Sequence, residues 1–286
     1  MYHLNLGIDA GNYEGKTIGQ FGEDSFKTNI CDWFVRDVEE SFGSDDMEFE
    51  IDGRKGFAGS IAKYEDEFGD GTRYGDSKAH EDTKIRVLLA IDRYMNRFCP
   101  QMEKVKIVTG QPIKRHNKVE KDLIINMLKG EHNIVVNGNP RKIIIEEVGV
   151  AGEGSGAFWV NPRMGVIRII DIGSGTINCA TIIDKKFINT ASTTFNFGVE
   201  TVSDRNDIER IANGVIRNTT KLKWNKQDEV LVCGGKSEVM LPFIKKHYAR
   251  AELISPIITR SIGDKVLHPV YANATGFYNI ALGAFK

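Results

Sequence analysis

Apolar residues fall three or four positions apart in several stretches of the chain, a spacing typical of helices that bury one face. The longest such stretch covers residues 81–98, and Pro100 follows where a helix has to stop. Further helices are predicted near residues 116–129, 202–218, 237–247 and 272–284. The chain is therefore expected to contain several amphipathic helices.

Strands are predicted between these helices. Tight hairpins are expected at Asp52-Gly53 and Asn137-Gly138, because such dipeptides favour the turns that join antiparallel strands. The run at 166–172 is apolar enough to be buried on both faces. The apolar runs predicted as strands are 105–109, 166–172, 178–183, 186–194 and 229–233. Strands that alternate with helices predict an α/β fold, and the Gly-rich segment 153–156 marks the expected joint between two halves.

Composition supports two moderate cores and excludes several classes of protein. The 286 residues are 41% hydrophobic, and the net charge of -1 gives no general attraction to nucleic acid or to an anionic membrane. With no basic leader and no apolar run of membrane-spanning length, a cytoplasmic protein is expected. The cysteines lie far apart and show no metal-ligand spacing, which predicts reduced thiols.

A short motif occurs once in each half. Residues 8–12 read Ile-Asp-Ala-Gly-Asn, and residues 170–176 read Ile-Asp-Ile-Gly-Ser-Gly-Thr, each between two predicted strands. A glycine in such a turn lets backbone N–H groups approach phosphate oxygens. The aspartate can hold Mg²⁺ through its water shell, since this ion keeps several waters. Two such turns that face each other would bind a triphosphate, with direct contacts from Asn12, Lys16, Ser174 and Thr176.

One copy of this motif alone is often an ordinary strand-end turn, and a third element distinguishes a nucleotide site from such a turn. The apolar strand 230–233 leads into Gly234-Gly235 and a helix start at Lys236, where the backbone can approach a flat base or a ribose. A glycine pair here is also compatible with a simple tight turn. Three elements in this order indicate a nucleotide site.

These elements resemble the phosphate-1, phosphate-2 and adenosine motifs of the actin, Hsp70 and sugar kinase superfamily, in order and spread across nearly the whole chain. Residues 108–112 and 274–283 look most similar to the bacterial plasmid-segregation actins of the ParM and AlfA type. The resemblance implies an actin-like ATPase fold with two related domains around a nucleotide cleft. Residues 201–228 have room for little more than one helix, which implies a missing or reduced subdomain IIB, as in AlfA.

The resemblance also implies domain ranges. Domain I would cover residues 1–152 and carry the phosphate-1 hairpin in subdomains IA and IB. Domain II would cover 153–270 and carry the phosphate-2 and adenosine motifs. Residues 271–286 would form a C-terminal connecting helix that returns to domain I, and residues 153–160 would connect the two halves.

The family pattern assigns roles to single residues. Glu153 lies at about the place where ParM-like proteins carry a glutamate that positions water, and Gln111 is a second candidate for that role. A glutamate beside a helix start can also be purely structural, and Glu146 or Glu147 could take the catalytic role instead. The metal would be held through water by Asp9 and Asp171. The implied nucleotide-binding residues are Asp9, Gly11, Asn12, Lys16, Asp171, Gly173, Ser174, Gly175, Thr176, Gly234, Gly235 and Lys236.

The function implied is a filament-forming ATPase that polymerises with Mg-ATP or Mg-GTP, hydrolyses it in the filament and drives plasmid segregation. Its partners would be further copies of itself and a DNA-binding adaptor protein at a plasmid centromere-like site, without direct nucleic-acid or membrane binding. A small-molecule, sugar-type kinase and an Hsp70-like regulatory ATPase use the same core. The first half offers no convincing aspartate base for a kinase, and a chaperone needs a substrate-binding domain. The choice between ATP and GTP stays open.

Overall fold

The structure, a computed structural model, describes residues 3–66, 77–202, 207–260 and 263–285. The chain forms two compact units, each with its own core. Unit 1 comprises Met1–Thr109, Lys118–Val150 and Ala281–Lys286, and unit 2 comprises Gly110–Asn117 and Ala151–Ile280.

Two segments group differently from the predicted domain ranges. Residues 110–117 belong to unit 2, because the Glu153 N–H donates to the Gln111 carbonyl at 2.9 Å and the Lys114 N–H donates to the Thr194 hydroxyl at 3.3 Å. The C-terminal helix groups with unit 2 as far as residue 280. The correspondence of these units to domains I and II stays a prediction.

Unit 1 is built on a nine-stranded sheet in its described residues. The strands are β1 (Leu4–Ala10), β2 (Glu14–Gly19), β3 (Gly22–Lys27), β4 (Ile30–Asp32), β5 (Met47–Ile51), β6 (Arg54–Ala58), β7 (Lys104–Gln111), β8 (Gly130–Val136) and β9 (Asn139–Gly152). Their order is β3-β2-β1-β7-β9-β8-β5-β6-β4, with β1 antiparallel to β2 and parallel to β7. The hairpins predicted at Asp52-Gly53 and Asn137-Gly138 are confirmed, and φ is positive at all these residues.

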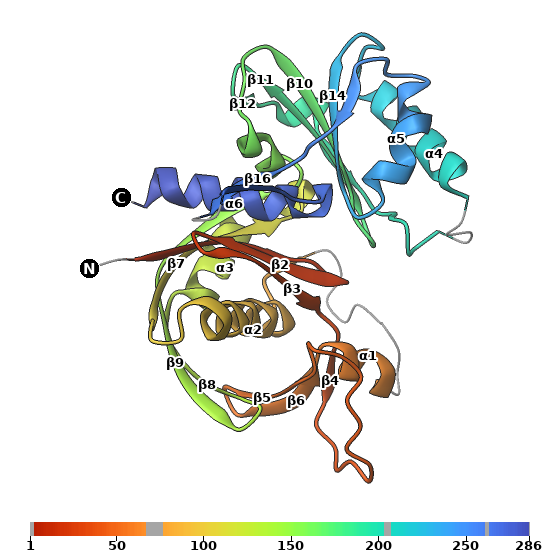
Figure 1. The fold of residues 1–286 in the computed structure, drawn as a ribbon. Coiled ribbons are helices and arrows are strands. Elements are labelled where there is room, and N and C mark those ends of the chain that lie inside the picture. Colours follow the sequence, from red (N-terminus) through yellow and green to blue (C-terminus); the bar gives the residue numbers. More distant parts are fainter. Residues whose placement is uncertain (1–2, 67–76, 203–206, 261–262, 286) are drawn as a thin grey trace. The chain divides into compact units, whose positions relative to one another are not determined.

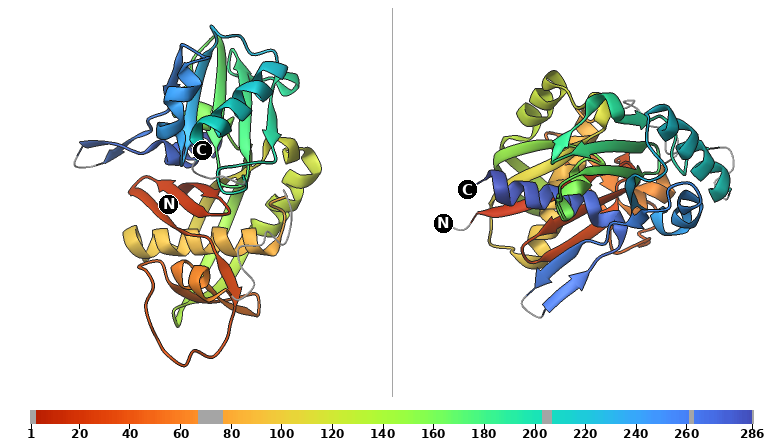
Figure 2. Two further views of the ribbon diagram at one scale, coloured as in Figure 1. Left: turned by 90° about the vertical axis from the view of Figure 1, so that its right-hand side faces the viewer. Right: turned by 90° about the horizontal axis from the view of Figure 1, so that it is seen from above.

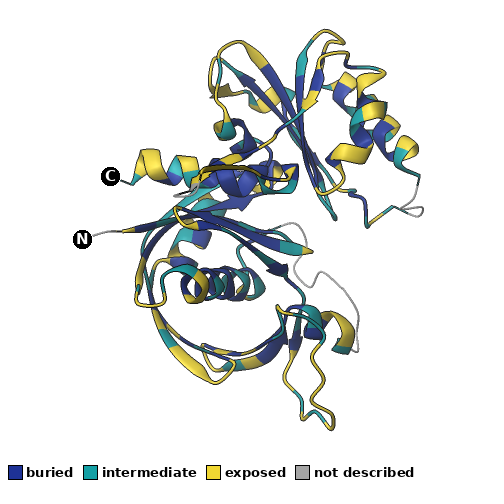
Figure 3. Cartoon of the chain, viewed as in Figure 1, coloured by how far each residue is buried: buried dark blue, intermediate teal, exposed yellow. Residues whose placement is uncertain are grey.

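The predicted helix at 81–98 is confirmed as α2 (Glu81–Phe98), which supplies much of the unit 1 core. Leu88 and Leu89 are fully buried, in the same apolar cluster as Leu6 and Ile8 of β1. The sheet curves around α2 (Figure 1), and the helix is largely buried along its length (Figure 3). The described residues of unit 1 also include the helices α1 (Ser60–Glu65) and α3 (Lys118–Leu128).

Unit 2 repeats the strand arrangement at the start of unit 1. Its main strands are β10 (Val166–Ile172), β11 (Ile177–Ile183), β12 (Lys186–Phe187), β13 (Thr193–Phe195), β14 (Glu229–Gly234) and β15 (Ala251–Leu253). Their order is β12-β11-β10-β14-β15, and β13 also pairs with β11. β10 is antiparallel to β11 and parallel to β14, as β1 is to β2 and β7. The motif repeated in the sequence therefore opens a repeated topology.

The single strand predicted at 186–194 is wrong. The 3₁₀ helix η3 (Asn189–Ala191) separates β12 from β13. The Thr181 N–H donates to the Ser192 hydroxyl at 2.8 Å, and that hydroxyl donates to the Ile188 carbonyl at 2.7 Å. Side-chain hydroxyl groups that bond to the backbone in this way compete with the hydrogen bonds of a strand ladder.

Two helices of unit 2, α4 (Ile208–Lys221) and α5 (Ser237–Lys245), pack against each other, and α5 also contacts β14 and β15. Both lie on the same side of the unit 2 sheet (Figure 1). Within the described residues 196–202 and 207–228, α4 is the only α-helix between β13 and β14. This agrees with the small space expected there, while the reduction of subdomain IIB stays a prediction.

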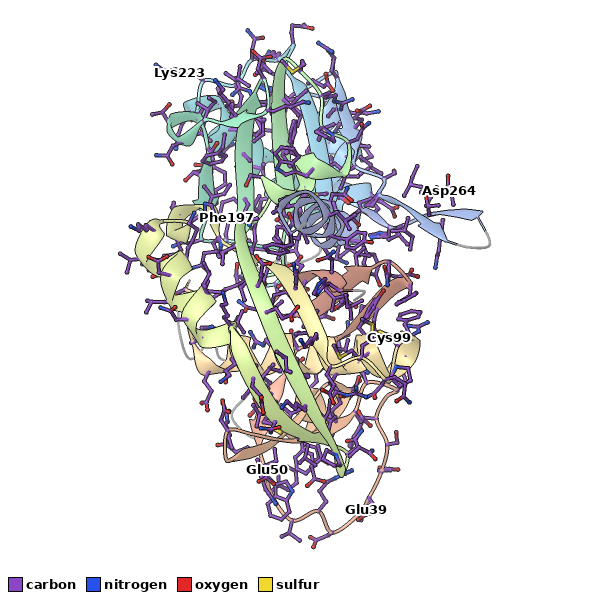
Figure 4. All side chains as sticks on the ribbon, turned by 90° about the vertical axis from the view of Figure 1, so that its left-hand side faces the viewer. Glu39, Glu50, Cys99, Phe197, Lys223 and Asp264 are labelled. Atoms are coloured by element: carbon purple, nitrogen blue, oxygen red, sulfur yellow. The ribbon has the colours of Figure 1, made fainter. Side chains whose placement is uncertain are left out.

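A two-stranded ribbon, β16 (Ile257–Arg260) and β17 (Gly263–Val266), was not indicated by the sequence pattern. It extends away from the other strands of unit 2 (Figure 2), and it carries Asp264 (Figure 4). After the ribbon, η4 (Pro269–Tyr271) leads into the C-terminal helix α6.

The helix predicted at 272–284 is confirmed as α6 (Ala272–Ala284), and it packs closely on the 3₁₀ helix η2 (Gly156–Val160). A Cβ at Gly276 would lie 2.0 Å from the Gly156 carbonyl oxygen, and a Cβ at Gly156 would lie 2.2 Å from the Phe277 ring. Real Cβ atoms do not approach so closely, so this contact requires glycine on both sides.

Gly276→Ala is expected to lower the free energy of unfolding by about 1–3 kcal/mol, because the added methyl forces α6 away from η2. Gly283→Ala is the matched control in the same helix, since no described atom lies within 4 Å of a Cβ there. The control should keep its stability or gain up to about 1 kcal/mol. Urea unfolding followed by circular dichroism measures both variants, and equal stability would contradict the packing.

Candidate functional site

Backbone contacts that need glycine shape the turn after β1. Asp9, half-buried at the end of β1, lies opposite Lys16 in the β1–β2 pairing. A Cβ at Gly11 would come 2.8 Å from the Glu14 carbonyl oxygen. The Gly11 carbonyl accepts the Thr28 hydroxyl at 2.7 Å, which fixes the turn in one conformation.

Three basic side chains gather at this turn. Lys16 and Lys78 are buried, and each donates to a backbone carbonyl that flanks the turn, at 3.0 and 3.1 Å. Arg86 of α2 donates to the Asn12 side chain at 3.0 Å, and burial lowers the pKa of its guanidinium. Positive charge around a glycine turn favours an anion such as phosphate. Lys16 was predicted for this role, whereas Lys78 and Arg86 were missed.

The turn after β10 is formed by Gly173, Ser174, Gly175 and Thr176, all half-buried. The Gly173 N–H donates to the Thr176 carbonyl at 3.0 Å. Backbone N–H groups of residues 199–200 donate to the carbonyls of Gly173 and Ser174 at 3.2 and 2.9 Å. No described atom lies within 4 Å of a Cβ at Gly175. The carbonyls of Gly173, Ser174 and Thr176 are therefore bonded within the protein, while the turn has open space beside Gly175.

The predicted glycine pair lies beside this turn, because β14 runs parallel to β10 and places Gly234 next to Ile172. Gly234 has a φ of 98°, and a Cβ there would come 2.2 Å from the Ile172 carbonyl oxygen. The Ser237 hydroxyl donates to the Gly234 carbonyl at 2.8 Å. Gly235 and Lys236 are exposed where α5 begins. The structure thus brings the second and third predicted elements to one end of adjacent strands.

Four buried side chains of unit 2, Glu153, Asp171, Asn178 and Asn273, form what we call the acid–amide cluster; each is 7% exposed or less. The Asn178 Nδ2 donates to Glu153 Oε2 at 3.3 Å and to Asp171 Oδ2 at 3.4 Å. The Asn273 Nδ2 donates to the same Asp171 oxygen at 3.0 Å. The predicted catalytic and metal-holding carboxylates of unit 2 therefore share one amide.

Neighbouring groups orient this cluster. The Thr194 hydroxyl donates to Asn178 Oδ1 at 2.7 Å, which directs the Asn178 N–H groups toward the carboxylates. The Cys233 thiol lies 3.8 Å from Asp171 Oδ1. Burial and the charge of Asp171 raise the pKa of the Cys179 thiol well above its usual value. Neutral amide donors allow two carboxylates to remain close in a buried site.

Gln111 is brought to Glu153 through the backbone. It is fully buried at the end of β7, and its carbonyl accepts the Glu153 N–H at 2.9 Å. A Cβ at Gly110 would lie 3.0 Å from Glu153 Cγ, and Gly154 has a φ of 74°. Glycine at positions 110 and 154 therefore lets the backbone beside Gln111 and Glu153 pack closely against neighbouring side chains.

The two alternative glutamates lie in unit 1 on β9. Glu146 pairs with Lys104 at 3.3 Å, and Glu147 pairs with Lys106 at 2.9 Å. Each carboxylate is occupied in an ion pair, whereas Glu153 lies in the acid–amide cluster of unit 2. This geometry favours Glu153 among the three.

Asn178 and Asn273 are site residues that the sequence reasoning missed. Asn178 follows Asp171 by seven positions in a buried strand that is apolar apart from Asn178 and Thr181. A polar residue in a buried strand needs hydrogen-bond partners, and this was the available signal. Asn273 lies in a segment that was singled out only for its resemblance to a connecting helix.

The residues fit a metal that is held through its waters. Among the described residues, no group of three or more His, Cys, Asp or Glu side chains could hold a metal ion directly. Mg²⁺ usually takes one or two carboxylates and keeps several waters. Asp171 suits this role because two amides fix its Oδ2. Asp9, the other predicted carboxylate, lies in unit 1.

A cavity of about 580 Å³ lies elsewhere in unit 2, lined by α4, Phe197 and Val202. Phe197 is labelled in Figure 4. None of the predicted site residues is among the described residues that line it. The candidate site therefore rests on the turns and the acid–amide cluster and not on this cavity.

Comparison with known families decides the identity. The family model described as "Actin like proteins N terminal domain" matches residues 7–156, which is 150 of the 286 residues. The chain belongs to the actin-like proteins. The matched region of this actin-like protein includes the turn after β1, Gln111 and Glu153. A search of curated proteins gives no match.

Solved structures show the same fold as this actin-like protein. A filament of AlfA bound to AMPPNP has a TM-score of 0.80 at 18% identity, with 100% of both chains covered. The filament of AlfA from B. subtilis plasmid pLS32 has a TM-score of 0.80 at 20% identity, with 99% of both chains covered. The crystal structure of apo pSK41 ParM has a TM-score of 0.74 at 16% identity, covering 99% of this chain and 98% of that one. The predicted α/β, actin-like fold is confirmed.

The described residues include no helix with both the length and the apolar character needed to cross a membrane.

Proposed function

We propose that this actin-like protein binds Mg-ATP or Mg-GTP, assembles into filaments in that state and hydrolyses the nucleotide in the filament. The observation that carries the proposal is the acid–amide cluster, in which Glu153 and Asp171 are held at the end of β10. The AlfA filament bound to AMPPNP supports it, because that ligand has the base, sugar and three-phosphorus chain of ATP.

In this proposal the predicted glycine turns bind the phosphates through backbone N–H groups, together with the basic side chains at the turn after β1. Asp9 and Asp171 hold Mg²⁺ through water, and the glycine pair after β14 contacts the base or the ribose. Bound Mg²⁺ would offset the negative charge of the phosphate chain. The other nucleotide-binding residues are those predicted at the two turns.

Glu153 is the proposed catalytic residue. A buried, hydrogen-bonded carboxylate has a fixed direction, which is what orienting an attacking water requires. Gln111 is the second candidate, since its carbonyl fixes the Glu153 backbone and both residues belong to unit 2.

The proposed cellular role is plasmid segregation in the cytoplasm. Solved filaments of AlfA with this fold support self-association. A DNA-binding adaptor at a plasmid centromere-like site would link the filament to its cargo, because a net charge of -1 gives the chain no general attraction to DNA. We also propose the predicted domain ranges and a reduced subdomain IIB, with α4 as the helix that remains between β13 and β14.

We predict that hydrolysis per monomer rises steeply above a critical protein concentration, because assembly completes the catalytic geometry. Phosphate release and right-angle light scattering should be followed together, with electron microscopy, in Mg-ATP and in Mg-GTP. A filament protein gives both signals above the same concentration. A rate strictly proportional to protein concentration, with stimulation by a sugar, would instead identify a small-molecule kinase.

A further inference from the structure

The side chain of Asn273 joins two parts of the site that are far apart in the sequence. Its Nδ2 donates to Asp171 Oδ2 at 3.0 Å, and its Oδ1 accepts the Gly154 N–H at 2.9 Å. Asn273 is 5% exposed and lies in the first turn of α6. Both ends of one rigid amide are therefore used, since the planar amide of Asn carries a donor and an acceptor side by side.

The two bonds bear on both carboxylates of the cluster. Asp171 is held directly, and Gly154 is the residue that follows Glu153. The Gly154 backbone runs close to the rest of the cluster, because a Cβ there would lie 3.1 Å from Asn178 Cβ and 3.4 Å from Asp171 Cβ. A shift of the Asn273 amide would therefore turn the Asp171 carboxylate and move the segment that carries Glu153.

We propose that Asn273 is a positioning residue for the metal-bound nucleotide: its amide fixes the Asp171 carboxylate in the direction that holds the waters of Mg²⁺. This inference rests on the proposed function. The competing interpretation is that Asn273 only anchors α6 to the connecting segment. Asn279 is a control for this competing interpretation. It also belongs to α6 and anchors the helix, because it donates to the Trp159 carbonyl in η2 at 2.8 Å, but it does not bond to Asp171.

The test is the affinity for a fluorescent N-methylanthraniloyl derivative of ATP, measured below the assembly concentration, once with Mg²⁺ and once with excess EDTA. The ratio of the two affinities is the gain due to the metal. Asn273→Ala is expected to reduce this gain about tenfold, the scale of a lost hydrogen bond to a charged group. Its affinity in EDTA should stay near that of the parent. Asn279→Ala should keep the full gain.

Two results overturn the inference: an unchanged metal gain in Asn273→Ala, or an equal loss of affinity with and without Mg²⁺, which would make Asn273 an anchor only. If circular dichroism shows that Asn273→Ala does not fold, Asn273→Ser takes its place, since serine suits a helix start but is too short to reach both partners. A parent protein that binds the probes of ATP and GTP no better with Mg²⁺ than without it would refute the proposed function itself.

Discussion

Glu153→Ala is expected to lower nucleotide hydrolysis by about two orders of magnitude, the scale of a positioned acid–base group. Binding and assembly should remain largely intact, because the glycine turns, the basic side chains and Mg²⁺ hold the nucleotide without this carboxylate. The attacking water depends on it. Glu153→Gln should show the same loss, since it keeps the size and an acceptor for the Asn178 amide but lacks the charge.

Filaments of these variants should persist, because the change from triphosphate to diphosphate that precedes disassembly is slowed. Light scattering and phosphate release in the same sample measure both effects. Glu147→Ala is the matched control: Glu147 lies on β9 and pairs with Lys106 of β7 at 2.9 Å, so this variant should behave like the parent. Normal hydrolysis without Glu153 would move the role to Gln111, and loss of scattering and hydrolysis together would make Glu153 structural.

Local signals in the sequence were sufficient for much of the fold. The apolar spacing of residues 81–98 gave the bounds of α2, and Asp52-Gly53 and Asn137-Gly138 form the expected turns with positive φ. These features depend on neighbours in the chain. The interruption at 189–191 depends on the Ser192 hydroxyl, which accepts the Thr181 N–H and donates to the Ile188 carbonyl, and the β16–β17 ribbon pairs only with itself among described strands. Neither has a local signal of the same strength.

In the candidate site, too, features set by neighbouring residues could be predicted and features set by distant residues could not. The glycine turns were visible because a turn and its glycines are adjacent in the sequence. The side chains that complete the site come from far away: Arg86 is 74 positions from Asn12, and Asn273 is 102 positions from Asp171. A single sequence carries no spacing signal for such partners, since only the folded chain brings them together.

Asp171→Ala is expected to weaken Mg-nucleotide binding by about 2–3 kcal/mol, or roughly 30- to 150-fold, the range for removing one partner of a buried charged interaction. The carboxylate is lost from the shell of waters around the metal, and the amides of Asn178 and Asn273 lose an acceptor. Assembly should fail as well, because the nucleotide-bound state is the one that polymerises. Isothermal calorimetry with Mg-ATP and light scattering measure the two effects.

Two further variants separate the charge of Asp171 from the stability of its surroundings. Asp171→Asn keeps the size and an acceptor oxygen but lacks the negative charge, so it should bind Mg-nucleotide nearly as weakly as Asp171→Ala while unfolding at a temperature closer to the parent's. Asp184→Ala removes an exposed aspartate at the opposite end of the β10–β11 hairpin, where its Oδ1 accepts the Gly165 N–H at 2.9 Å. Because that end lies away from the glycine turn, binding and assembly should match the parent. If Asp171→Ala bound Mg-ATP as tightly as the parent, the phosphate and metal roles assigned to the turn after β10 would be wrong.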